Sequence, residues 1–174
     1  YMVYKGMITN VPQEVIDYVA ADPERSVKYA ENVTRYRFPE GEAAIATSAE
    51  YSFRYAKYAM KERFPAGEKA IATSAKWSTR YAQDVIRGRF PAGEAAIATS
   101  AEFSYEYARN AIKGRFPEGE KIIATDPKKS YDYAEGVINH VSLDTAGTRI
   151  TYIRPLDGGK PWPHSDAQPH RWRL

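Results

Sequence analysis

The chain has 174 residues, of which 43% are hydrophobic and 27% charged, and its formal net charge is +3. This composition is typical of an ordered protein and excludes wholesale disorder. The absence of cysteine excludes disulfide bonds, a cysteine nucleophile and cysteine zinc sites. No apolar run reaches the roughly 18–20 residues that cross a bilayer, and no secretory signal opens the sequence, so we expect no membrane partner.

One 26-residue segment recurs four times between residues 37 and 140, and a more divergent copy precedes it at 11–36. A fixed period of this length predicts a stack of repeats instead of one closed core. We therefore expect a lead-in at 1–10, a helical array at 11–140 and a cap or arm at 141–174. The expected units of the array are 11–36, 37–62, 63–88, 89–114 and 115–140.

Each copy predicts two helices. Pro39 suits the first turn of a helix, and Glu42 follows it where a carboxylate complements the helix dipole. Ser48 is expected to cap a second helix, because the last copy has Asp126 followed by proline at this position. The glycine after the second helix, Gly88 in one copy, predicts a left-handed residue at the helix end.

The second helix carries one apolar stripe. Ser52, Tyr55, Ala56, Ala59 and Met60 follow the helical spacing i, i+3, i+4, i+7 and i+8, which predicts a buried face. Because the tyrosine recurs in every later copy, we expect a ladder of buried rings whose hydroxyl groups reach either a hydrogen-bond partner or the rim of the array. The ladder consists of Tyr55, Tyr81, Tyr107 and Tyr133.

The period ends at residue 140. Residues 148–153 alternate like a short strand, and the proline- and glycine-rich residues after them predict an extended course. His164, Asp166 and His170 superficially suggest a metal site. Since no helical spacing relates them, we interpret them as part of a solvated tail and expect neither a metal nor a cofactor.

Two sets of cations recur where each second helix ends. They are Arg37, Arg63, Arg89 and Arg115 in the first set and Lys61, Arg87 and Lys113 in the second. A basic ridge of this kind could bind a phosphate backbone. The structural alternative is that the cations complement the helix carboxyl ends or pair with the glutamate of the same or an adjacent unit.

Aromatic residues occupy two positions of the second helix that vary between copies. They are Tyr51, Trp77 and Phe103 at the first position and Phe53, Tyr105 and Tyr131 at the second. Because they vary while the scaffold repeats, and because exposed aromatic side chains anchor many interfaces, we interpret them as a candidate partner-binding surface. The alternative is that they extend the packing between units.

The sequence does not predict an enzyme. The three histidines lie at or beyond the end of the repeats, and no glycine-rich phosphate loop follows a strand. Carboxylates are abundant, but they recur with the period, whereas a catalytic pair should occur once. No catalytic residue is therefore assigned.

The motifs RFPEGE and RFPAGE at the start of the copies, together with the SxxYA motif, resemble tandem short helical repeats of bacteriophage and environmental viral proteins. The resemblance covers residues 11–140. It implies a viral source and an interaction role. Since the sequence shows neither a signal peptide nor a transmembrane segment, we expect a location in the host cytoplasm or the virion. A looser likeness relates residues 11–23 to leucine-rich-variant helical repeats, but Phe-Pro and Tyr-Ala depart from that pattern, so only the architecture carries over.

We thus expect an all-α solenoid of about five two-helix units, followed by an extended carboxy-terminal segment that includes a short strand. The expected function is a non-enzymatic protein–protein interaction scaffold, either a virion or assembly component or an accessory protein that binds a host factor. Self-assembly is a further possible partnership. The alternative function is nucleic-acid binding along the basic ridge.

Overall fold

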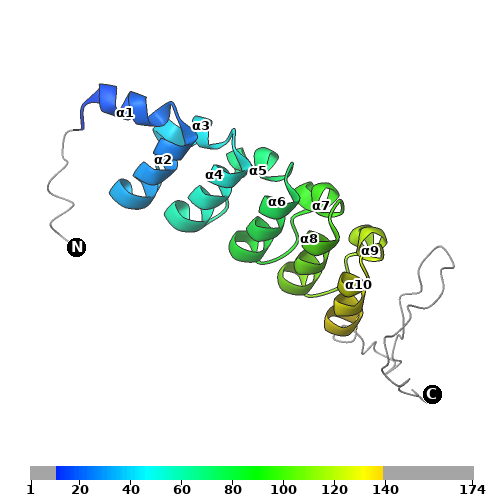
Figure 1. Ribbon diagram of the computed structural model, residues 1–174. Helices are drawn as coiled ribbons and strands as arrows, with labels where there is room; N and C mark the ends of the chain where they lie inside the picture. Colours follow the sequence, from blue (N-terminus) through cyan, green and yellow to red (C-terminus); the bar gives the residue numbers. More distant parts are fainter. Residues whose placement is uncertain (1–10, 139–174) are drawn as a thin grey trace, which may run out of the picture.

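The computed structural model describes residues 11–138, which form an all-α stack of successive helix pairs without a strand (Figure 1). The first helices of the pairs are α1 (Gln13–Ala20), α3 (Glu42–Ile45), α5 (Pro65–Ile71), α7 (Pro91–Ile97) and α9 (Pro117–Ile123). The second helices are α2 (Pro23–Tyr29), α4 (Ala49–Arg54), α6 (Ala75–Tyr81), α8 (Ala101–Glu106) and α10 (Pro127–Tyr133). The prediction of an all-α repeat solenoid is confirmed.

Several predictions concern residues outside the described range. They are the lead-in at 1–10, the cap or arm at 141–174, the strand at 148–153 and the solvated tail with His164, Asp166 and His170. Within residues 11–138, none of the helices is both long and apolar enough to cross a bilayer.

Every second helix begins as an α-helix and continues as a π-helix, whose turns are wider. The π segments are η2 (Ala30–Thr34), η4 (Tyr55–Met60), η5 (Ala82–Ile86), η6 (Tyr107–Ile112) and η7 (Ala134–Ile138), and a short 3-10 helix, η3 (Pro39–Gly41), precedes α3.

The predicted caps are present, since the side chain of Ser48 accepts the Tyr51 N–H and that of Asp126 accepts the Lys129 N–H at 3.0 Å.

The prediction of a left-handed residue at the glycine is wrong by one position. The positive φ falls on the cation before the glycine, with values of 58° at Arg87 and 50° at Lys113, and on the equivalent Lys61 at 59°. The helix ends one residue earlier than predicted, at Ile86 in the third unit. The Gly88 N–H then donates to the Ala82 carbonyl oxygen at 3.2 Å and closes the helix end.

The units stack because each second helix contacts both helices of the next pair, so that α4 touches α5 and α6, and α6 touches α7 and α8. In Figure 1 the first helices follow one edge of the array and the second helices follow the other. The close approach depends on a glycine in the first helix. A Cβ atom at Gly93 would lie 2.5 Å from the Ser78 hydroxyl oxygen of the preceding unit.

The core is a continuous ladder of aromatic rings. Tyr55 packs edge-on against Phe64 of the next unit, with ring centroids 5.1 Å apart, and Tyr81 packs in the same way against Phe90 at 5.3 Å. All four tyrosines of the predicted ladder are fully buried. Beside them, the buried hydroxyl of Ser52 donates to the Ile45 carbonyl oxygen at 2.9 Å and joins the two helices of its own unit.

Candidate interaction surface

A hydrogen-bonded network occupies the start of each clear repeat. In the unit at 63–88, the Arg63 guanidinium donates to both carboxylate oxygens of Glu68 at 2.8 and 2.9 Å. The Tyr81 hydroxyl donates to the same carboxylate at 2.9 Å and accepts the buried Phe64 N–H at 2.9 Å. The network therefore ties the loop before the first helix to the second helix of its own unit.

The same network is present in the other three clear copies, with bond lengths between 2.6 and 3.0 Å. Its members there are Arg37, Glu42 and Tyr55, then Arg89, Glu94 and Tyr107, then Arg115, Glu120 and Tyr133. The arginines of the candidate ridge are thus engaged by glutamate, as the structural alternative supposed.

The charge states of the network follow from its surroundings. Burial raises the pKa of Tyr81 to about 12, and the charge of Glu68 adds to this effect. Burial also opposes ionisation of Glu68, but hydrogen bonds from Arg63 and Tyr81 and the charge of Arg63 outweigh it and lower its pKa. At neutral pH the carboxylate is charged and the phenol neutral, as the bonding pattern requires.

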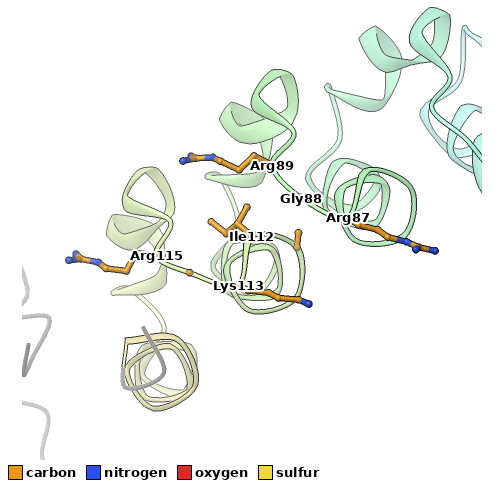
Figure 2. Close-up of a pocket in the computed structure, with 8 residues that line it drawn as sticks. Arg87, Gly88, Arg89, Ile112, Lys113 and Arg115 are labelled. Carbon is orange, nitrogen blue, oxygen red and sulfur yellow. The ribbon is translucent and has the colours of Figure 1, made fainter. Parts of the chain in front are cut away.

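The remaining cations of the candidate ridge lie elsewhere. Lys61, Arg87 and Lys113 are exposed, and within residues 11–138 they form no ion pair. Figure 2 shows Arg89 and Arg115 on one side of two successive loops, and Arg87 and Lys113 pointing to the other side. The depression between these loops measures about 370 Å³. The seven cations therefore do not form a single ridge.

The second aromatic position packs between units. Phe53 and Tyr105 are only 3% and 8% exposed. The Phe53 ring lies 5.4 Å from the Trp77 ring of the next unit, and the Lys129 ammonium lies 5.4 Å from the Tyr105 ring centroid. These two residues are unavailable as binding anchors, which corrects their assignment to the partner-binding surface. Tyr131 is 59% exposed, because no described unit follows it.

The first aromatic position stays partly open to solvent. Tyr51, Trp77 and Phe103 are half-buried. Charged side chains flank them on the same helix: Lys76 and Arg80 lie 4.5 and 5.6 Å from the Trp77 ring centroid. We call this surface the outer stripe. It consists of Glu50, Tyr51 and Arg54 on α4, Lys76, Trp77 and Arg80 on α6, and Glu102, Phe103 and Glu106 on α8.

The charges of the outer stripe differ from unit to unit. Each helix carries two of these charges at fixed positions. The two charges are of opposite sign on α4, both positive on α6 at Lys76 and Arg80, and both negative on α8 at Glu102 and Glu106. The stacking of repeated units does not require the sign of these charges to change from unit to unit. The outer stripe is therefore a surface on which the units differ in chemistry.

No group of carboxylate and imidazole side chains within residues 11–138 could hold a metal ion. No family model matches this sequence, and neither a curated protein nor a solved structure does.

Proposed function

We propose that the chain is a non-enzymatic scaffold that binds a partner protein along the outer stripe. The proposal is based on a difference between two sets of residues within the repeat. Polar residues that recur in every copy, such as Arg63, Glu68 and Tyr81, are bonded to one another, whereas the exposed residues of the outer stripe change from unit to unit. A viral assembly component and an accessory protein that binds a host factor would both use such a surface.

The charge pattern supports a protein as the partner. A polyanion presents one sign of charge along its length and would be repelled at Glu102 and Glu106 on α8. A protein surface can instead match charges whose sign changes from unit to unit, since complementary charges set the register and select the partner. The half-buried ring of Trp77 would supply the apolar anchor, because tryptophan is enriched among residues that dominate binding energy.

The double variant W77A/R80A tests this proposal. It removes the anchor and one flanking charge, so we expect the affinity for a partner captured by the wild-type chain to fall about tenfold or more. The measurement is calorimetric titration with the purified partner, and circular dichroism checks that the helical signal is retained. K69A, on the exposed surface of α5, is the matched control. Unchanged affinity of a folded double variant would refute the role of the outer stripe.

Nucleic-acid binding is the second candidate, because Lys61, Arg87 and Lys113 recur as exposed cations without an ion pair in the described array. If these cations contact phosphates, mixed-sequence DNA should bind more weakly as salt rises. The triple variant K61E/R87E/K113E should then reduce the slope of log K against log salt by about 3, near one unit for each lost contact. An absence of wild-type binding at low salt would eliminate this candidate.

A further inference from the structure

The last described unit leaves open a surface that every earlier unit buries. The second helix of each of four units contains a fully buried serine, and the residue that follows this serine in the sequence is at most 8% exposed. These pairs are Ser26 and Val27, Ser52 and Phe53, Ser78 and Thr79, and Ser104 and Tyr105. In the last unit Ser130 is partly exposed and Tyr131 is 59% exposed.

The alanine one turn further on follows the same rule. It is fully buried in the four earlier units and partly exposed at Ala134. We call Ser130, Tyr131 and Ala134 the end face. Among the described residues, no segment covers the end face. Its equivalents are covered by the unit that comes next in the sequence, for example where Gly67 lies against Ser52 and Trp77 against Phe53.

We propose that residues 139–174 of the same chain dock on the end face. The described array ends at Ile138, the last residue of η7. In each earlier unit the chain continues from the equivalent point into the unit that covers the equivalent face. The segment that follows is longer than the 26-residue period. It includes apolar residues that suit an exposed tyrosine and alanine, namely Val141, Leu143, Ile150, Tyr152, Ile153 and Trp162.

A second copy of the chain fits the end face less well. In register with the repeats, its first unit would place Val15 where the later units have glycine, because the Val15 N–H donates to the Pro12 carbonyl oxygen as the Gly41 N–H donates to that of Phe38. A Cβ atom at Gly41 would lie 2.5 Å from the Ser26 hydroxyl oxygen, and the side chain of Val15 would meet Ser130 in the same way. The first unit therefore cannot dock in the manner of a repeat.

Photo-crosslinking of the full chain tests the proposal. With p-benzoylphenylalanine in place of Tyr131, we expect a crosslink within one chain to a peptide from residues 139–174, at a yield independent of protein concentration. The same group in place of Tyr58, which is 51% exposed on η4, is the control and should give at least severalfold less of this product.

Three results would overturn the proposal. A crosslinked dimer whose yield rises with concentration would assign the end face to a second copy. A product confined to residues 11–138, or a yield equal to that of the Tyr58 control, would mean that residues 139–174 do not dock there. Circular dichroism of both labelled proteins verifies that the array is folded. The inference does not depend on the proposed binding role of the outer stripe.

Discussion

Replacing Gly93 by alanine is expected to lower the free energy of unfolding by about 2–4 kcal/mol. The added Cβ atom would lie 2.5 Å from the Ser78 hydroxyl oxygen, 2.6 Å from the Ser78 Cβ atom and 2.7 Å from the Phe90 ring. Ser78 and Phe90 are both buried, so neither can move aside into solvent. Urea unfolding followed by circular dichroism measures the effect.

Gly88→Ala is the matched control for Gly93→Ala. A Cβ atom at Gly88 meets no atom within 4 Å, and its φ is not in the left-handed region, so we expect a change within about 1 kcal/mol. The double variant S78G/G93A should recover part of the lost stability, because it removes the two closest contacts. Equal effects of Gly93→Ala and Gly88→Ala would show that the glycine–serine contact does not control the stacking.

Replacing Tyr81 by phenylalanine is expected to lower the free energy of unfolding by about 2–3 kcal/mol. The ring remains, so no cavity forms, but the buried Phe64 N–H loses its acceptor and Glu68 loses a donor. An unsatisfied buried donor costs more than an average hydrogen bond contributes. Besides urea unfolding, the exchange rate of the Phe64 amide should rise.

Tyr36→Phe is the control for Tyr81→Phe, because Tyr36 is 61% exposed. This substitution removes an exposed hydroxyl group and should change the free energy of unfolding by less than about 0.5 kcal/mol. If Tyr81→Phe were no more harmful than Tyr36→Phe, the network would not be a structural element of the repeat.

The period and local signals in the sequence were enough to predict the stack, the caps at Ser48 and Asp126, and the buried tyrosine ladder. They could not predict the π-helical continuation, because the apolar stripe is compatible with an α-helix to its end. The left-handed residue was placed at Gly88 instead of Arg87, since it depends on where the helix ends, and helix ends are uncertain by one or two residues.

The candidate surface was predicted only in part. Residues two apart on a helix differ by about 200° in direction, so Tyr51 and Phe53 cannot face the same surface. Applying this rule would have separated the inter-unit position from the outer stripe. The pairing of Arg63 with Glu68 was considered, but sequence alone did not decide between it and a phosphate site, because both uses need an exposed guanidinium.

The most direct test of the account is to insert a second copy of residues 63–88 after residue 88 and to measure helical content and unfolding by circular dichroism. If the repeated residues supply everything that a unit needs to stack, the helical signal should rise in proportion to the 26 added residues. The chain should also unfold cooperatively, at the same temperature or a higher one. An insertion that adds no helical signal, or that splits or lowers the unfolding transition, would contradict the account.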